Sequence, residues 1–456
     1  MRAALRVVLT LWLSCAAIAT RAQDDDLDDI LGGFDDDDPV FEIEEADTTA
    51  TTRARWWDFS GSVETSGSVA FRDHHSDTGT DYGGLQRLRT RLNGALDVDV
   101  PEAWLAGDWK LRLEGWGFWD AAYAIQGRSR YTRAVLGAYE LDGEVGEAWA
   151  QGAVHDAVDL KLGRQIVVWG RSESLRVLDV LNPLDNREPG RIDLEDLRRP
   201  LAMARADAYA GAWTLSAIAV PEIRFDRNPV RGSDFFAGTA AVREAKPHDF
   251  SDSEYAGALT GVFPGWDVSL HGAWFWNDLP RLSRSAPLLV HDRLWLAGVG
   301  GNLTIGGWLL KFELAGLGGL GFSNSSEEKQ RVDVLAGVEY YGFRDTTVVF
   351  EVVNRHLFDY EAALGAPPDF ARENAAELAL RITRSLLHET LHLTVLAIAL
   401  DWDAGGGSVV RLDADYELRD ALSVGVGVLL YQKGDAPPLD GWERNDRLIF
   451  DVKWSF

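Results

Sequence analysis

Apolar and polar residues alternate with a period of two along most of the chain beyond residue 55. In the first alternating segment, one parity carries apolar or small residues and the other carries mostly Asp, Ser, Glu and Arg. The apolar or small positions are Trp57, Phe59, Gly61, Val63, Gly67, Val69 and Phe71. Because successive side chains of a strand point to opposite faces, this period predicts a β-strand with one apolar and one polar face.

The alternation recurs, with tryptophan at several segment ends, at 87–98, 109–120, 266–276 and 447–456. Alternating segments of about ten residues that are bracketed by aromatic residues are typical of a transmembrane antiparallel β-barrel. A soluble β-sandwich would also alternate, but it would seldom place eighteen Trp residues on its faces. The predicted fold class is therefore all-β, with a transmembrane barrel over residues 56–456.

The spacing of the segments gives about eighteen strands, with sixteen as the alternative count. An even count places both ends of the barrel on the periplasmic side. Short turns are expected near 101–107, 155–157, 264–265, 342–345, 385–388 and 418–420. Long outward loops are expected near 72–84, 125–136, 221–253, 277–291, 319–329, 356–373 and 433–444.

The first 22 residues have the pattern of a secretory signal peptide. A short basic leader is followed by an apolar run over 7–20 and by small residues up to Ala22. The only cysteine of the chain, Cys15, lies in this run, and the bulky Leu13 nearby disfavours a lipidation site. Export of the chain, together with the barrel pattern, predicts a protein of the outer membrane of a Gram-negative bacterium, embedded among its lipids.

Residues 23–55 form an acidic segment that is expected to be disordered and periplasmic. Thirteen acidic residues and no basic residue lie between 23 and 52, and the whole chain has a formal charge of -27. Nucleic acid is excluded as a partner, because phosphate binding needs a basic surface.

Four apolar residues with helical spacing, Leu27, Ile30, Leu31 and Phe34, interrupt the acidic segment. They predict a short docking motif that orders when it binds a partner, such as a periplasmic protein or an exporter of the RND superfamily. The alternative is a disordered leader with incidental apolar residues.

The strands carry a row of basic residues on the parity that faces the lumen. Arg87, Arg89 and Arg91 follow one another on one strand, with Lys110 and Arg112 on the next. Such a stripe can favour anionic solutes. The alternative is that these cations pair with neighbouring Asp and Glu and hold the wall together.

Two patterns in the sequence resemble enzyme motifs, but the expected distances between their residues do not fit a catalytic site. The letters HETLH at 388–392 match a zinc-peptidase pattern, but the alternation continues through them, and on a strand His388 and His392 would lie about 13 Å apart along its axis. Ser269 and His271 share a face, but we expect them to stand about 7 Å apart with no third group to orient them. The sequence therefore predicts no enzyme, no metal site and no cofactor.

The densest local motif lies between residues 160 and 229. Its first element is Gly163, Arg164, Gln165, Val167, Trp169 and Gly170, its second is Asn182, Pro183 and Asp185, and its third is Pro221, Glu222, Arg227, Asn228 and Pro229. The motif resembles a family of proteobacterial outer-membrane barrels whose domain has no assigned function. Arg171 stands where that family usually has Glu. The resemblance implies a neighbourhood with RND-superfamily exporters and traffic in lipids or other hydrophobic compounds.

The same stretch carries a physical conflict. Arg164 falls on the lipid-facing parity of its strand, where a charge costs several kcal/mol. A bulge at Gly163 that turns Arg164 inward would remove the conflict. Residues 171–201 are too long for a simple loop, and we expect them to fold into the lumen and constrict it near the motif residues, with a surface excursion as the alternative.

The predicted function is that of an outer-membrane transport component, which moves or delivers lipid-like or other small hydrophobic or anionic molecules together with an RND-type exporter. A general diffusion porin and a structural or docking barrel are the alternatives. The C-terminal Phe456 is the expected signal for the barrel assembly machinery.

Overall fold

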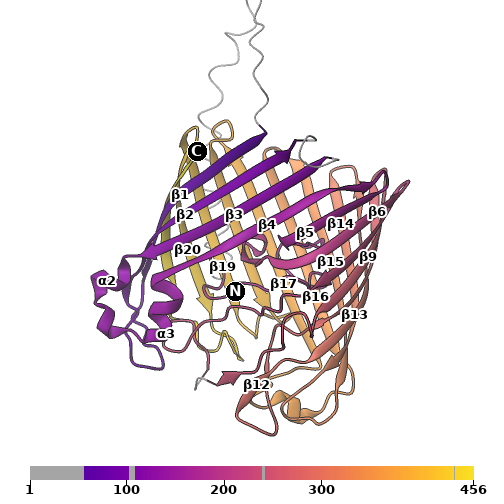
Figure 1. Ribbon diagram of the computed structural model, residues 1–456. Coiled ribbons are helices and arrows are strands. Elements are labelled where there is room, and N and C mark those ends of the chain that lie inside the picture. Colours follow the sequence, from indigo (N-terminus) through magenta and orange to yellow (C-terminus); the bar gives the residue numbers. More distant parts are fainter. Residues whose placement is uncertain (1–55, 102–107, 239–241, 436) are drawn as a thin grey trace, which may run out of the picture. The chain divides into compact units, whose positions relative to one another are not determined.

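A computed structural model describes residues 56–101, 108–238, 242–435 and 437–456, which form a closed antiparallel β-barrel of eighteen strands (Figure 1). The predicted fold class and the strand count of eighteen are thus confirmed. The predicted signal peptide and the acidic segment, including Leu27, Ile30, Leu31 and Phe34, lie outside the described residues.

Each barrel strand pairs with the next one along the chain, and the first pairs with the last to close the barrel. The strands are β1 (Trp57–Ala70), β2 (Gly84–Val100), β3 (Trp109–Asp120), β4 (Leu141–His155), β5 (Val158–Gln165), β6 (Leu201–Ala210), β7 (Trp213–Val220), β9 (Glu254–Phe263), β10 (Trp266–Trp276), β13 (Arg293–Ile305), β14 (Trp308–Leu320), β15 (Lys329–Phe343), β16 (Thr346–Leu357), β17 (Asn374–Leu386), β18 (Leu391–Leu400), β19 (Ser408–Arg419), β20 (Leu422–Gln432) and β21 (Arg447–Ser455).

The remaining described elements are short. A small sheet is formed by β8 (Arg243–Glu244), β11 (Arg281–Leu282) and β12 (Leu288–Val290). The helices and single turns are α2 (Ala122–Gln126), η2 (Arg128–Arg130), α3 (Arg133–Val135), η3 (Leu136–Glu140), α4 (Leu194–Leu197) and η4 (Ala362–Gly365). In the described part of the chain, no helix is long and apolar enough to cross a membrane.

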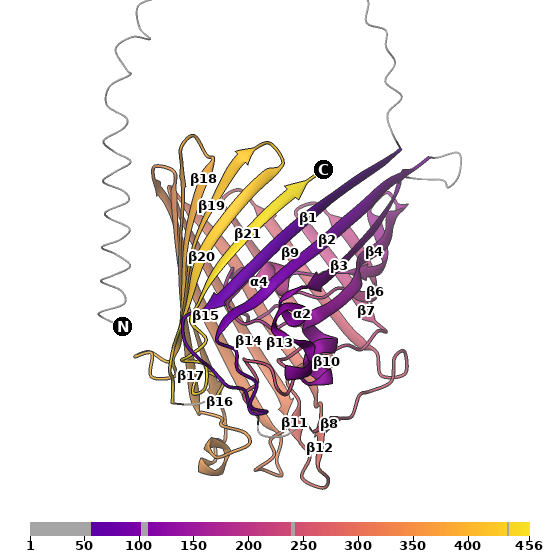
Figure 2. The ribbon, with the colours of Figure 1, turned by 90° about the vertical axis from the view of Figure 1, so that its left-hand side faces the viewer.

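The two ends of the barrel differ in their connections (Figures 1 and 2). The end that carries Trp57 and Phe456, called the terminal end below, has turns at 156–157, 211–212, 264–265, 306–307, 344–345, 387–390 and 420–421. Five of these match predicted turns, and those at 211–212 and 306–307 were not anticipated. The opposite end, called the loop end, carries the long connections, including α2, α3 and the small sheet.

The outer face has the surface of a membrane barrel. Large apolar side chains such as Leu270, Phe312 and Val334 are exposed in the middle of the strands. Exposed tryptophans stand next to the short turns at Trp213, Trp266, Trp308 and Trp454, and near the loop end at Trp119, Trp274 and Trp295. An apolar band between two aromatic girdles is the arrangement that a bilayer requires.

Gly163 of β5 has a backbone conformation that other residues rarely adopt. Its φ is +120°, and an added Cβ would lie 2.8 Å from the Cα of Trp149 and closer still to the carbonyl oxygen of Ala148. The β4–β5 register runs through Gly163 without interruption, so the expected bulge is absent and the positive φ takes its place. The guanidinium of Arg164, the next residue, donates to Glu222 and so avoids the lipid.

We expect Gly163→Ala to destabilise the barrel by about 1 to 3 kcal/mol, because it forces an L-residue into a region of φ that favours glycine. The midpoint of urea-induced unfolding of the refolded barrel, followed by tryptophan fluorescence, measures this change. Gly137→Ala is the matched control, since a Cβ there meets open space. Equal midpoints for the two variants would contradict the prediction.

Candidate functional site

The connection between β5 and β6, residues 166–200 and called the inserted segment below, runs through the barrel interior. Glu313 on β14 accepts hydrogen bonds from the backbone amides of Arg171, Ser172 and Leu178, at 2.5, 3.1 and 3.0 Å. The side chain of Glu313 is almost fully buried. A wall carboxylate therefore takes the place of water for three amides of the inserted segment.

A second wall carboxylate holds the neighbouring turn. Glu351 on β16 accepts from the hydroxyl of Ser172 at 2.6 Å and from the amides of Glu173 and Ser174 at 3.0 and 3.1 Å. Lys311 pairs with Glu339 of β15 and also lies 3.3 Å from Glu173 and 3.9 Å from Glu351, so three acids share one cation. Glu313 and Glu351 together form the amide anchor of the inserted segment.

Apolar side chains complete this attachment. Val167, Trp169, Val177 and Leu178 are buried in one cluster with inward-facing residues of β13 to β16. Part of the lumen is thus an apolar core, although the interior of a large barrel is usually polar.

Arg171 also contacts the wall. Its guanidinium pairs with Asp267 on β10 at 2.7 Å and donates to the hydroxyl of Ser269 at 3.3 Å. Ser269 lies 2.8 Å from Nε2 of His271, so the expected separation of about 7 Å is wrong, because both side chains bend toward each other. The ring of Trp169 packs on His271 at 4.7 Å between centroids, and both hydrogen-bonded side chains are buried. Through Arg171 and Trp169, this pair helps to hold the inserted segment.

Asp193 attaches the inserted segment, just before α4, to the part of the wall that adjoins β16. Its carboxylate pairs with Arg381 of β17 at 2.8 Å and with Arg411 of β19. Burial raises the pKa of Asp193, but the hydrogen bond from Arg381 and the charge of Arg411 outweigh it and hold the pKa below its usual value. Asp193 is therefore an anion at neutral pH, and its ion pairs attach the inserted segment to β17 and β19.

Two of the motif residues, Arg164 and Arg227, lie near one carboxylate on β4, that of Glu144. Glu144 is approached by four guanidiniums, those of Arg164, Arg199, Arg224 and Arg227. The distances are 4.0 Å to Arg164, 3.3 Å to Arg199 and 3.7 Å to Arg227. These five residues, from β4, β5, the inserted segment and the loop after β7, are called the Glu144 hub.

The remaining motif residues shape the inserted segment locally. Asn182 accepts from the amide of Val167 at 2.8 Å and donates to the carbonyl of Gln165 at 3.2 Å. Pro183 accepts from the amide of Arg199 at 2.8 Å, and Gln165 donates to Met203. Each bond joins two stretches that are distant in sequence, so the motif fixes the path of the chain.

Asp185 links the inserted segment to the loop after β7. It pairs with Arg187 at 2.6 Å and lies 3.8 Å from Arg227. Burial lowers the pKa of Arg187, but the hydrogen bonds and charge of Asp185, with that of Asp142, raise it above its usual value. Arg187 therefore carries its charge at any physiological pH.

A bulge on β4 places two acids on the same face. The β3–β4 register shifts between Leu113 and Gly115, so that Gly146 and Glu147 together face Glu114. On a regular strand, residues three apart point to opposite faces. Because of the bulge, Glu144 and Glu147 both line the lumen.

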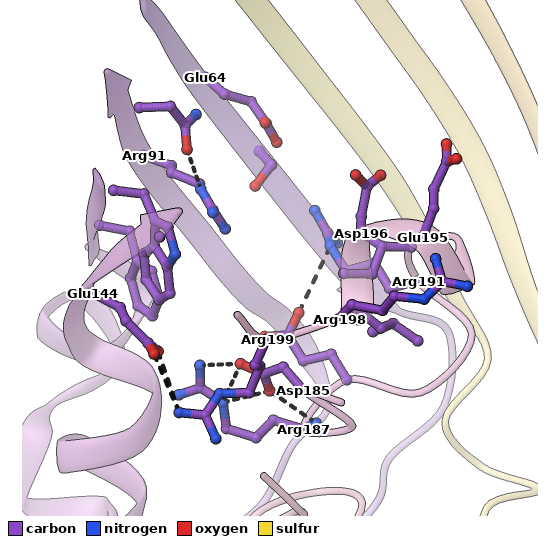
Figure 3. A pocket seen from close by; sticks show the side chains of 18 of the residues that line it. Glu64, Arg91, Glu144, Asp185, Arg187, Arg191, Glu195, Asp196, Arg198 and Arg199 are labelled. Atoms are coloured by element: carbon purple, nitrogen blue, oxygen red, sulfur yellow. Dashed lines mark hydrogen bonds and ion pairs between the residues drawn. The ribbon is translucent and has the colours of Figure 1, made fainter. Parts of the chain in front are cut away.

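A cavity of 430 Å³ lies between the inserted segment and the wall formed by β1 to β4 (Figure 3). It reaches Lys453, close to the end of β21 at the terminal end of the barrel. Its basic lining residues are Arg87, Arg89, Arg91, Arg187, Arg191, Arg198, Arg199 and Lys453, and its acidic ones are Glu64, Glu114, Glu144, Glu147, Asp185, Glu188, Glu195 and Asp196. The cavity is therefore highly charged but balanced, and we call it the charged cavity.

The predicted basic stripe is divided between two places. Arg87 and Arg89 line the charged cavity, and both pair with Asp120 of β3 and with Glu188 of the inserted segment. Arg91 lies over the ring of Trp116 at 4.3 Å and donates to Asn93, and no ion pair joins it to another described residue.

The other two residues of the stripe lie closer to the terminal end. Lys110 is largely exposed, 3.9 Å from Asp99. Arg112 pairs with Asp97 at 3.0 Å and with Glu114 at 3.4 Å. The β2–β3 register sets Arg112 beside Asp97, several residues from Arg91, so these two cations add nothing to the lining of the charged cavity.

On the side of the charged cavity that faces the loop end, the lumen narrows. A cavity of only 30 Å³ shares Arg87, Arg89, Glu188 and Arg191 with the charged cavity and reaches Arg447, the first residue of β21 at the loop end. Its volume is about that of one water molecule. The ion pairs of Glu188 thus form a constriction between the two ends of the lumen.

The HETLH stretch is a turn at 387–390 followed by β18, as the alternation predicts. His388 has a φ of +57° in the turn, and His392 lies near Ser385 of β17. Among the residues that the structure describes, no group of three or more His, Cys, Asp or Glu could hold a metal ion.

A family model, Protein of unknown function (DUF1302), matches residues 6–456 of the chain. The chain belongs to the DUF1302 family. No curated protein matches the chain in sequence.

Solved structures with the same fold support the barrel architecture. Acinetobacter baumannii OccAB3 is 12% identical, with a TM-score of 0.52 over 88% of this chain and 99% of that one. Pseudomonas aeruginosa OccK2 (OpdF), solved in complex with glucuronate, is 13% identical, with a TM-score of 0.51 over 88% and 98%. At these identities the likeness establishes the fold of this DUF1302 protein.

Several residues of the site were not identified from sequence. The two acids of the amide anchor, Glu313 and Glu351, are single acids on the lumen parity of mostly apolar strands. An isolated charge in such a strand is a usable signal, since it must find a partner inside the barrel. For Glu144 there was no such signal, because the bulge beside it is invisible in the alternation.

We expect Glu351→Gln to loosen the inserted segment. The amide group can no longer accept all three hydrogen bonds, and each lost charge-assisted bond is worth about 1.5 to 3 kcal/mol. The open probability in single-channel recordings should therefore rise about tenfold or more.

Asp207→Asn is the matched control for this change. Asp207 is a buried lumen acid whose partners, Arg205 and Ser216, belong to the wall itself. An equal rise in both variants, or none in Glu351→Gln, would show that the amide anchor does not hold the lumen closed.

Proposed function

We propose that this DUF1302 protein is a channel of the outer membrane that passes small charged or amphipathic molecules through a lumen closed by the inserted segment. The observation that carries the proposal is the charged cavity, which ends at the constriction around Glu188. Its 430 Å³ fall within the range of small-molecule sites in proteins, about 300 to 1,000 Å³.

The occluded lumen speaks against a general diffusion porin. Such a porin needs an aqueous path, whereas here the inserted segment lies in the lumen and is held to the wall by the amide anchor, the pairs of Asp193 and the Glu144 hub. A purely structural barrel would not need a sizeable charged cavity on the route between its ends. Transport with a conformational step fits both observations.

Because acidic and basic residues are balanced in the charged cavity, the positions of these charges, and not the net charge, select the molecules that bind. The Glu144 hub gathers positive charge at one side, while Glu64, Glu195 and Asp196 lie at another (Figure 3). A molecule with an anionic group can approach Arg91 and Arg191, because Arg191 has only Glu188, at 3.7 Å, as an ion-pair partner among the described residues. Burial lowers the pKa of Arg191, which means that its charge is poorly compensated.

An exporter of the RND superfamily remains the partner we propose, with the acidic segment and its residues Leu27, Ile30, Leu31 and Phe34 as the docking element. Lipid-like cargo remains part of the same proposal. Both rest on the family resemblance and on the sequence pattern. Co-purification with and without residues 24–38 tests the partner, since an unchanged set of partners would remove the docking element.

The channel itself is tested by planar-bilayer recording of the refolded barrel. We expect small, brief openings, and we expect Glu144→Gln to shift the reversal potential in asymmetric KCl toward anions. The variant removes the one acid that faces Arg164, Arg199, Arg224 and Arg227 together. Arg91→Gln should shift the reversal potential toward cations.

Lys110→Gln serves as the control for the loss of one charge, because Lys110 is exposed near the terminal end. Large, steady steps from the unmodified protein would indicate an open diffusion pore and contradict the proposal. If the unmodified barrel is silent, the same comparison is made in the Glu351→Gln background.

A further inference from the structure

The side chains on the lumen face of β18 change from polar to apolar halfway along the strand. His392 and Thr394 are polar, but Leu396, Ile398 and Leu400, which have the same parity, are apolar. Leu396 pairs with Arg411, whose guanidinium reaches Asp193 inside the barrel, so these three side chains face the lumen. An apolar lumen face without a filling side chain is unusual in a barrel of this size.

These residues line a separate cavity of 190 Å³. Its wall also includes Val409 and Arg411 of β19, the latter paired with Asp193 and Asp413, and, from the loop between β20 and β21, Pro438, Leu439 and Trp442. The lining is almost entirely carbon, and we call the cavity the apolar chamber. An apolar cavity of about 150 Å³ stays free of water and can bind benzene, so the chamber has room for one ring or a short hydrocarbon chain.

Specific contacts hold the aromatic side chains beside the chamber in place. The Nε1 of Trp442 donates to the carbonyl of Phe235 at 3.1 Å, which leaves the ring of Trp442 as an apolar surface. Phe235, Tyr431 and Trp442 pack together with centroid separations of 5.3 to 6.1 Å. A second cavity, of 480 Å³, shares Trp442 with the chamber and includes Phe235 and Phe236 in its lining, so apolar surface continues toward the loops.

One turn of the inserted segment separates the chamber from the charged cavity. Gly190 lines the chamber, and Arg191, the next residue, lines the charged cavity. Gly190 has a φ of +75°, and a Cβ on it would lie 2.8 Å from the Cγ1 of Val409. The turn is held by Tyr431, whose hydroxyl donates to the carbonyl of Pro189 at 2.6 Å.

We propose that the apolar chamber binds the uncharged hydrocarbon end of an amphipathic monoanion, while its charged end is directed to Arg191. This inference rests on the proposed function and narrows its substrate class, from small charged or amphipathic molecules to those with a ring or a chain of about six carbons. Gly190 in the apolar chamber and Arg191 in the charged cavity are consecutive residues. This arrangement matches a molecule whose charged group lies next to its apolar part.

Calorimetric titration of the barrel in lipid nanodiscs, corrected with empty nanodiscs, tests the chamber. The probes are hexanoate and acetate, which share a carboxylate and differ by four methylene groups. Each buried methylene strengthens binding about fourfold, so we expect hexanoate to bind on the order of 100-fold more tightly than acetate. Equal affinities would overturn the proposal.

Two variants locate the site. Ile398→Trp fills the chamber from the wall and Leu439→Trp fills it from the loop, so both should abolish the preference for hexanoate. Ala397→Trp adds the same ring on the opposite face of β18 and should leave the preference intact. A preference that survives both filling variants would place hexanoate elsewhere and overturn the assignment. Leu439→Trp lies outside the strands, so it keeps the test valid if Ile398→Trp does not fold.

Uptake of labelled hexanoate into proteoliposomes separates this inference from the proposed function. Uptake that is lost in the filling variants supports both. Binding without uptake would leave the apolar chamber in place and overturn the transport function. Uptake of acetate and hexanoate at equal rates, with equal affinities, would keep the channel and remove the chamber as a substrate site.

Discussion

The structure depends on how a long connection can be buried inside a barrel. Backbone amides that leave water must find acceptors, and a loop cannot supply them from its own regular structure. Glu313 and Glu351 solve this problem from the wall, because each carboxylate accepts several hydrogen bonds from a few consecutive residues. The remainder of the inserted segment can then cross the lumen, since its first turn is fixed to β14 and β16.

The charges in the lumen follow from the same constraint. A carboxylate removed from water needs compensation, and here it comes from amides at Glu313 and from guanidiniums at Glu144. Such clusters tie distant parts of the chain together, as Asp193 does between α4, β17 and β19. The result is a lumen with many charges but little net charge along the charged cavity, so the positions of the charges decide what can bind.

The barrel could be predicted from the sequence, because its outer face must be apolar along every strand. The alternation, as around residues 57–71 and 109–120, therefore predicts the fold, and the spacing of such segments predicts the count of strands. The interior obeys no such rule. Inward-facing Leu335 and Val353 pack against the inserted segment although their strands carry charged residues at other inward positions, so the alternation does not show which inward positions are apolar.

The motif between 160 and 229 showed where the site lies but not what it does. Arg164 was a conflict on a lipid-facing parity, and only the positive φ of Gly163 and the position of Glu222 show how it is resolved. The separation between Ser269 and His271 was wrong for a related reason, since side-chain reach is not contained in strand spacing. Contacts made by long polar side chains across a lumen depend on the three-dimensional path of the loops.

The lumen thus offers two environments, one charged and one apolar, on the two sides of a single turn at Pro189 to Arg191. An apolar molecule gains little from the charged cavity, and a purely ionic one gains nothing from the chamber, because transfer of a charge into an apolar site is costly. A molecule that has both parts can be held from both sides while the turn moves. The division of the lumen therefore acts as a filter for amphipathic molecules, and the constriction at Glu188 need open only when such a molecule is present.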